Sequence, residues 1–167
     1  MSARALVLAA VLVLASGIAS AQWRDSLRVP SAVDDVLAHQ DRAMDILLAW
    51  GGLSVGAGAV MVFQPSPVVR AFGIQNLAWG AINAGIALWA QNSIKEKRRN
   101  GFSMEEERAS FRRILLINTL LDLLYVAVGV GLMLSEKESL RGHGIGVTVQ
   151  GSFLFFFDGI NYLLAGD

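Results

Sequence analysis

Residues 114–134 read ILLINTLLDLLYVAVGVGLML, and Asp122 is their one charged side chain. A helix on the surface of a soluble protein carries a charged or polar face along its length. This segment has no such face, and its length matches the roughly 20 apolar residues that cross the hydrocarbon core of a membrane. We therefore predict a membrane-spanning helix here.

Three further segments have the same composition. Arg70 is the one charge between residues 46 and 94, and Asp158 is the one charge between residues 144 and 166. A soluble helical bundle is the alternative, and it would need a charged stripe that these segments lack. We predict an all-α, four-helix transmembrane bundle, with spans at residues 46–63, 73–94, 114–134 and 145–165.

The first 21 residues have the composition of a secretory signal segment. Arg4 precedes an apolar run from Ala5 to Leu14, and small residues at 19–21 fit a cleavage site. An uncleaved anchor helix is the alternative, for which the run is at the short limit. We predict a signal peptide at 1–21, a polar tail at 22–30 and the four-helix domain at 31–167.

Helix starts and turns divide the rest of the chain. Capping boxes begin at Ser31 and Ser103, and Ser66 followed by Pro67 forms a third start signal. The charged stretches KEKRRNG (95–101) and SEKESLRGHG (135–144) interrupt the apolar pattern. We predict that both are turns.

The two halves of the chain resemble each other at a shift of 74 residues. This shift sets Asn76 against Gln150 and Trp79 against Phe153. A repeat of this kind predicts two helical hairpins related by a rotation axis along the membrane normal. Chance similarity among glycine-rich spans is the alternative, and the sequence does not decide between the two.

Two rules for membrane orientation conflict. A cleaved signal leaves residue 22 outside the cytoplasm, and four spans then leave the basic segment 95–113 on that side. The positive-inside rule instead places this segment in the cytoplasm. We follow the signal and expect the basic charges to be partly neutralised at the protruding helix ends. The expected acidic partners are Asp34, Asp35, Asp41 and Asp45, and the expected basic partners are Arg108, Arg112 and Arg113.

Polar side chains within the spans share helix faces. Asn118, Asp122 and Tyr125 fall at i, i+4 and i+7. At a rise of about 1.5 Å per residue, Asn83 lies at the depth of Asp122, and Asn118 at the depth of Asp158. We expect one intramembrane polar cluster, made of Asn76, Asn83, Asn118, Asp122, Tyr125, Gln150, Asp158 and Asn161.

The polar cluster has two interpretations. Carboxyl groups within a membrane often mark a proton or cation path, with Asp122 and Asp158 as carriers. A hydrogen-bonded core that fixes the helix register is the other interpretation. We favour the second, because no basic partner lies in the spans and amides outnumber acids.

Small residues at helical spacing predict close helix packing. The positions concerned are Gly52, Gly56, Gly58, Gly85 and Gly131. Trp50 and Trp89 lie near span ends, as interfacial aromatic residues do.

No constellation of catalytic residues stands out. The chain has no cysteine, and His39 and His143 lack a second ligand at metal spacing. The formal net charge is zero, so no global field attracts nucleic acid. We predict no catalytic residue, no metal and no cofactor, and a protein that is not an enzyme.

Three segments resemble an uncharacterised bacterial family of small membrane proteins, known only as a domain of unknown function. The segments are FGIQNLAWGAINAGIALW (72–89), INTLLDLLYVAVGVGL (117–132) and RGHGIGVTVQGSFLFFFDGINYL (141–163). The resemblance implies a signal-like N-terminus and four helices, and the glycine-rich first span departs from it. The matching positions are Asn76, Trp79, Asn83, Asn118, Asp122, Tyr125, Gln150, Gly151 and Asp158.

These observations predict a multi-pass protein of the bacterial inner (cytoplasmic) membrane. Its expected partners are membrane lipid and other membrane helices or a second copy of itself. We expect an accessory or scaffold protein that acts through helix association, and the alternative is a small proton- or ion-coupled transporter.

Overall fold

The computed structural model describes residues 36–166. In this range the chain forms no strand and four helices: α2 (Val36–Met61), α3 (Pro67–Asn100), α4 (Met104–Met133) and α5 (Glu138–Leu164). The predicted all-α class is therefore confirmed. The predicted signal segment 1–21, the tail 22–30 and the capping box that begins at Ser31 lie outside the described residues.

Two of the helices begin where the sequence predicts. Ser66 and Ser103 accept hydrogen bonds from the backbone N–H groups of Val69 and Glu106, and so cap α3 and α4. Such bonds satisfy N–H groups that have no partner within the first turn of a helix. Gly101 follows α3 with a φ of 82°, which a glycine adopts without steric cost.

The two predicted turns are shorter than expected. Residues 95–100 continue α3, and residues 138–144 already belong to α5. The prediction was wrong because Lys, Glu and Arg are good helix formers, so charge alone does not end a helix. Lys97, Arg98 and Arg99 also lie in the last turn of α3, where the helix dipole favours positive charge.

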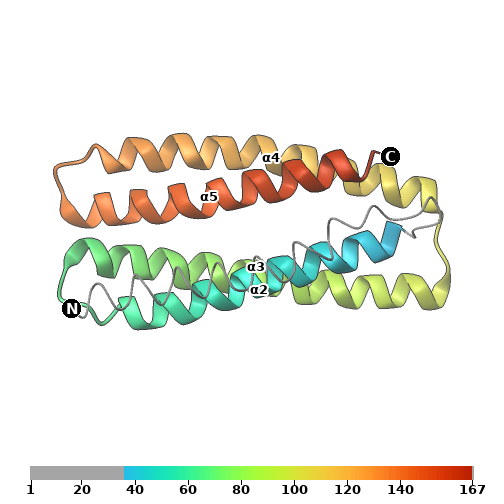
Figure 1. Ribbon diagram of the computed structural model, residues 1–167, viewed down its shortest axis with the longest axis horizontal. Helices are drawn as coiled ribbons and strands as arrows, with labels where there is room; N and C mark the ends of the chain where they lie inside the picture. Colours follow the sequence, from blue (N-terminus) through green and yellow to red (C-terminus); the bar gives the residue numbers. More distant parts are fainter. Residues whose placement is uncertain (1–35, 167) are drawn as a thin grey trace. The chain divides into compact units, whose positions relative to one another are not determined.

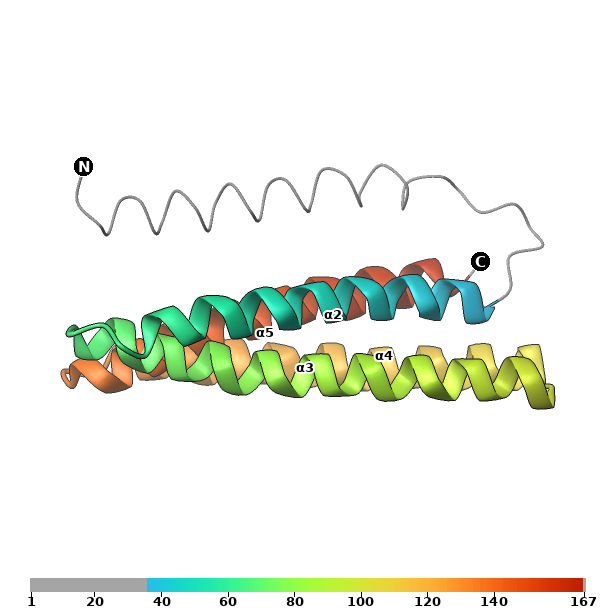
Figure 2. The same ribbon diagram turned by 90° about the horizontal axis from the view of Figure 1, so that it is seen from below.

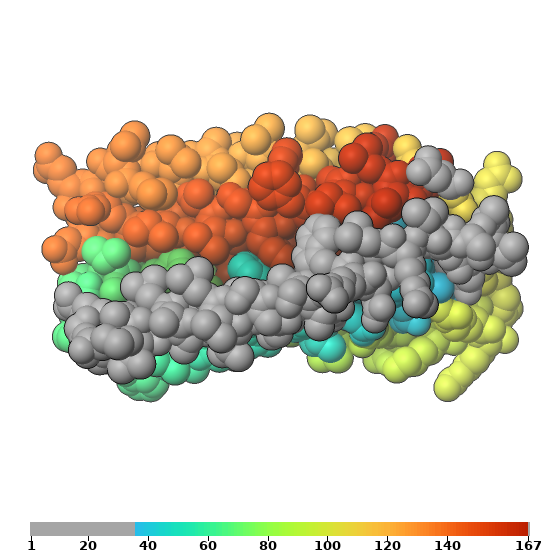
Figure 3. All heavy atoms as spheres, in the orientation of Figure 1, coloured from blue at the N-terminus to red at the C-terminus, as the bar shows by residue number. Residues whose placement is uncertain are grey.

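The helices form two antiparallel hairpins, α2–α3 and α4–α5 (Figure 1). Both hairpin turns lie at one end of the bundle, and the α3–α4 connection lies at the other. Figure 2 shows α2 and α5 in one layer and α3 and α4 in the other, while α3 packs against α5 across the centre. In the space-filling view, the α4–α5 hairpin runs lengthwise beside residues of the other hairpin (Figure 3).

Glycines bring the helices of each hairpin into backbone contact. A methyl group on Gly51 would lie 2.8 Å from the carbonyl oxygen of Gly80, and one on Gly144 would lie 2.6 Å from that of Gly129. Only a residue without a side chain allows this approach. The apolar core lies towards the α3–α4 connection, where Leu37 and Ala87 are fully buried.

Two helices, α2 and α4, are long and apolar enough to cross a membrane. Helices α3 and α5 do not meet the same measure of length and hydropathy in the described residues. Their amide and acidic side chains, among them Asn76, Asn83, Gln150 and Asp158, lower their mean hydropathy, although these side chains are buried in the bundle.

Candidate functional site

Gln150 lies at the centre of a hydrogen-bond network that joins three helices. Its side chain has no exposed surface. Its Nε2 donates to Oγ of Ser54 at 3.1 Å and to Oδ1 of Asn76 at 3.0 Å, while its Oε1 accepts from Nε1 of Trp50 at 2.8 Å. Asn76 in turn donates to the carbonyl oxygen of Phe72 at 2.9 Å. Every polar atom of the Gln150 amide is thus engaged, as burial requires.

Aromatic and imidazole side chains fill the seam between α2 and α5. Trp50 stacks on Phe153 with ring centroids 4.0 Å apart. A side-chain hydrogen bond of 2.8 Å links His39, near the start of α2, to Asn161, near the end of α5. Burial lowers the pKa of His39, and the nearby charges of Arg42 and Arg108 lower it further, against the opposing effect of the Asn161 bond. Side-chain contacts therefore join α2 to α5 at two levels, around Trp50 and at His39.

The opposite seam, between α3 and α4, contains a groove of about 430 Å³. Residues of all four helices line it, most of them from α3 and α4. Ile86 and Trp89 on α3 face Ile114 and Leu121 on α4, and all four side chains are exposed. The groove is thus apolar at its rim and open along the flank of the bundle.

Polar side chains form the base of this groove. Asn83, Asn118, Asp122 and Asp158 all line it. The Asp122 and Asp158 carboxyl groups lie within hydrogen-bond reach of each other. Two carboxyl groups in this arrangement can form a hydrogen bond only when one of them carries a proton. Beside them, the ring of Tyr125 packs edge-on against the ring of Trp79, with the ring centroids 5.1 Å apart.

Two atoms at the base have no hydrogen-bond partner within residues 36–166: Nδ2 of Asn83 and Oδ2 of Asp122. Their side chains are 2% and 3% exposed, respectively. A buried polar group without a partner costs about 1–3 kcal/mol. One donor and one acceptor are therefore left unsatisfied in the same groove.

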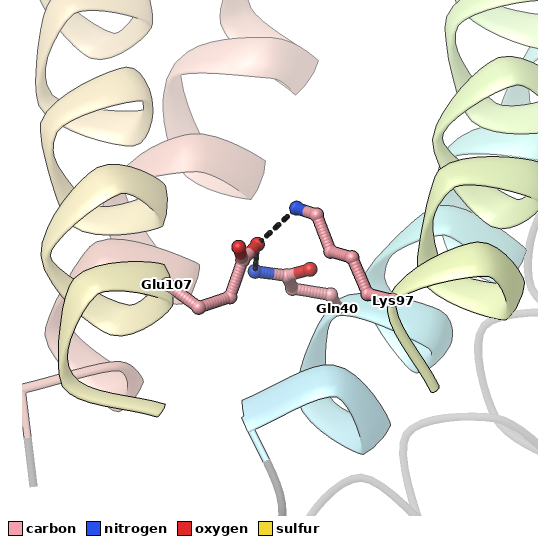
Figure 4. Close-up of polar contacts among 3 residues, drawn as sticks. All are labelled: Gln40, Lys97 and Glu107. Atoms are coloured by element: carbon pink, nitrogen blue, oxygen red, sulfur yellow. Dashed lines mark hydrogen bonds and ion pairs between the residues drawn. The ribbon is translucent and has the colours of Figure 1, made fainter. Parts of the chain in front are cut away.

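A polar contact lies at the end of the groove near the α3–α4 connection, and its three residues, Gln40, Lys97 and Glu107, line the groove (Figure 4). Nζ of Lys97 lies 2.6 Å from Oε1 of Glu107, and Nε2 of Gln40 donates to the same oxygen at 2.9 Å. Burial raises the pKa of Glu107, but the hydrogen bonds from Lys97 and Gln40 and the charge of Lys97 outweigh it and hold the pKa below its usual value. Three helices meet at this carboxylate.

The predicted polar cluster is gathered into the interior, in three parts. Asn76 and Gln150 belong to the central network, Asn161 pairs with His39, and the remaining members lie at the groove. The expected proximity of Asn83 to Asp122 and of Asn118 to Asp158 agrees with their shared groove. The close neighbour of Asp122 is Asp158, which the depth argument did not identify.

The predicted packing glycines separate into two groups. Gly58 packs within the bundle, because a methyl group there would lie 2.7 Å from the carbonyl oxygen of Gly73. By contrast, a methyl group would meet no atom within 4 Å at Gly52, Gly56, Gly85 or Gly131. These four positions make no helix contact within the described bundle, and their packing against another molecule stays a prediction.

The ion pairs differ from those expected. Arg98 of α3, rather than an arginine of α4, pairs with Asp41 at 3.4 Å. Asp45 accepts a hydrogen bond from Gln91 of α3 at 2.8 Å, while Arg112 lies over the ring of Tyr162. For Asp41 and Asp45 the expected pairs were wrong, because α3 is the hairpin partner of α2 and remains helical through its charged end. Asp34 and Asp35 lie outside the described residues.

Sequence reasoning missed Trp50, Ser54 and Glu107 as parts of these sites. Trp50 and Ser54 are four residues apart on the buried face of α2, so their spacing was an available signal. Trp50 is not an interfacial residue in this bundle, since it bonds to the buried Gln150, whereas Trp89 is 73% exposed.

Comparison with known proteins places the chain in a family. Searches among curated proteins and among solved structures gave no match. A family model described as a family of unknown function, DUF6992, matches residues 46–159. This range contains the network around Gln150 and the residues that line the groove, except Gln40 and Met44. The chain therefore belongs to the DUF6992 family of unknown function.

Proposed function

We propose that this chain is a small multi-pass membrane protein that acts, without catalysing a reaction, as an accessory or scaffold protein through helix association. The observation that carries this proposal is the distribution of polarity. Large apolar side chains are exposed along the helices, among them Ile82, Leu120 and Leu124, while Asn76, Asp122 and Gln150 are buried. Soluble monomers rarely expose apolar patches larger than a few hundred Å².

The burial of α4 supports lipid as its surroundings. Only 17% of its most apolar stretch is buried in the bundle. A core helix of a soluble protein is equally apolar but mostly buried, because water would otherwise contact its side chains. Our proposed location is the cytoplasmic membrane of a bacterial cell, which follows from the resemblance rather than from the geometry.

Outward-facing small residues support association with another helix. Gly52 and Gly56 lie one turn apart on α2 with open space above both. A pair of glycines four residues apart lets a second helix approach to backbone contact, and such pairs recur at membrane helix interfaces. The proposed partner is a second copy of this chain or another membrane helix.

The experiment has two stages. Membranes from expressing cells are first extracted with alkaline carbonate, and the chain should stay in the pellet. Self-association is then measured by energy transfer between labelled copies in liposomes, with Gly52→Leu and Gly56→Leu compared with Val128→Leu on the exposed face of α4. The two glycine variants should weaken transfer and the control should not. A soluble monomer in the first stage would refute the membrane proposal, and equal transfer in all variants would refute association through these glycines.

A second candidate function is a proton- or ion-coupled transporter. The adjacent carboxyl groups of Asp122 and Asp158 favour it, because paired acids within a membrane can exchange a proton or hold a cation. Flux would be compared in liposomes containing the parent, Asp122→Asn or Asp158→Asn. Flux in the parent that both variants abolish supports transport, and absent or unchanged flux rejects it.

A further inference from the structure

The groove between α3 and α4 has the dimensions of a ligand site. Its volume of about 430 Å³ lies within the range of roughly 300–1,000 Å³ that small-molecule sites occupy. From Asn83 to Lys97 it follows α3 for a helical rise of about 20 Å. Lys97, Glu107 and Gln40 lie at one end, and the open flank is the accessible side. A ligand would enter sideways between the two helices.

The rim of the groove selects for an apolar chain. Ile86 and Trp89 from α3 and Ile114 from α4 line it with exposed side chains. Burial of apolar surface between them is favourable by about 25 cal/mol per Å² relative to water. In a bilayer the gain over lipid is smaller, so the polar base must provide the selectivity.

The base of the groove selects for one kind of head group. Nδ2 of Asn83 needs an acceptor, and Oδ2 of Asp122 needs a donor, and both side chains are more than nine-tenths buried. A hydroxyl or an amide supplies both from a single group. A quaternary ammonium supplies neither bond, and a carboxylate would be repelled by the acidic pair of Asp122 and Asp158.

We propose that this groove binds a lipid-like molecule with a long apolar chain and a neutral hydroxyl or amide head group. The head group lies between Asn83 and Asp122, and the chain extends past Ile86 and Trp89 towards the flank. The inference rests on the membrane location proposed above, and it adds a ligand site to a protein for which only helix association was proposed.

The test uses Trp89 as a reporter in the full-length protein reconstituted in lipid nanodiscs. A dibrominated long-chain alcohol is titrated, because bromine quenches tryptophan fluorescence at contact. The methyl ether with the same chain serves as the matched probe, since it accepts a hydrogen bond but donates none. The quenching lost in Trp89→Phe is assigned to the groove. We expect the alcohol to quench Trp89 at a concentration at least about fivefold lower than the ether.

Variants separate the two contacts. Asp122→Leu should remove the preference for the alcohol, because the ether cannot donate to Oδ2 of Asp122. Asn83→Leu removes a donor that serves both probes, so it should weaken quenching by the alcohol and by the ether alike. Gln91→Leu, on α3 but outside the groove, should change neither. The weaker quenching expected in Asn83→Leu still tests the site if Asp122→Leu fails to fold. Trp89 is exposed, and Gln91 makes one exposed hydrogen bond to Asp45, so Trp89→Phe and Gln91→Leu should leave the fold intact.

Three results would overturn the proposal. Equal quenching by alcohol and ether would mean that ordinary lipid and water fill the groove. A preference that survives in Asp122→Leu, or unchanged quenching in Asn83→Leu, would mean that the alcohol binds elsewhere. Stronger quenching by a brominated amine that depends on Asp122 alone would mean a cation site. None of these results affects the carbonate extraction, so failure of the ligand site is distinguishable from failure of the membrane proposal.

Discussion

Nε2 of Gln150 donates to Oδ1 of Asn76 at 3.0 Å, and the two residues are 74 positions apart in the chain. This separation equals the shift that aligns the two halves of the sequence. Equivalent residues of a two-fold repeat meet each other only near its axis, and α3 and α5 do pack together at the centre of the bundle. The contact is what a parallel repeat of two hairpins predicts.

Replacing Gln150 by leucine should destabilise the bundle by about 2–3 kcal/mol, because three hydrogen bonds of roughly 1 kcal/mol each are lost. The change also leaves Nε1 of Trp50 buried without an acceptor. Thermal unfolding in detergent, followed by circular dichroism, measures the effect. Gln91→Leu is the matched control, since Gln91 makes one exposed bond to Asp45. Equal melting temperatures for the two variants would contradict the central role of Gln150.

Two asparagines of α3 should respond oppositely to the same substitution. Asn76→Leu breaks the bond with Gln150 and should destabilise by about 1–3 kcal/mol. Asn83→Leu removes a buried donor that has no partner in the described chain and should raise the melting temperature of the ligand-free protein. The unfolding of both variants is measured in one detergent. A lower melting temperature for Asn83→Leu would show that its amide is satisfied after all.

Alanine substitutions at two glycines of α2 should change the stability of the protein in opposite directions. Gly58→Ala should destabilise, because its methyl group would lie 2.7 Å from backbone atoms of Gly73 and Leu77. Gly52→Ala meets open space and should stabilise by up to about 1 kcal/mol, the difference in helix propensity between alanine and glycine. Urea unfolding of the monomeric protein in detergent compares them. Stabilisation by Gly58→Ala would mean that α2 and α3 lie farther apart than described.

Glu107 should make stability depend on pH in the acid range. The pKa of Glu107 is lowered in the folded state, so its contribution is fully present above the pKa of the unfolded chain, about 4.3. The contribution is lost as the pH falls through the folded value. The difference in unfolding free energy between the parent and Glu107→Gln should therefore be constant near neutral pH and shrink below about pH 5. A difference that grows on acidification would contradict the assigned pairing with Lys97.

Much of the fold is predictable from the sequence. Ser66 and Ser103 mark helix starts because their hydroxyl groups cap free N–H groups, a local interaction that needs no knowledge of the rest of the chain. The charged ends of α3 and α5 were misjudged for the opposite reason. Their residues are compatible with helix or turn, and tertiary partners such as Asp41 and Glu107 are part of what keeps the end of α3 helical.

The candidate site is only partly predictable. Residue types and depths identify which polar side chains lie inside, but each residue turns a helix by about 100°. A rotation by one position therefore exchanges Gly51 for Gly52 at the α2–α3 contact. The side-chain volumes of all neighbouring helices set this rotation together. The local sequence pattern thus identifies the buried amides and acids. It does not predict that Asn83 and Asp122 share a groove in which each has an atom without a hydrogen-bond partner, while Gln150 is fully bonded.

The groove lies where few side-chain contacts join the two hairpins in the described residues. Side-chain contacts join α3 to α4 at two levels, through Lys97 with Glu107 and through Trp79 with Tyr125. A partly exposed ion pair contributes about 0–1 kcal/mol and an aromatic pair about 0.5–1.5 kcal/mol. These two contacts are weak, whereas the backbone contacts at the glycines resist a change within either hairpin. Each hairpin is stiff, so a bound molecule would set the width of the gap between the two hairpins and leave the helix spacing within each hairpin unchanged.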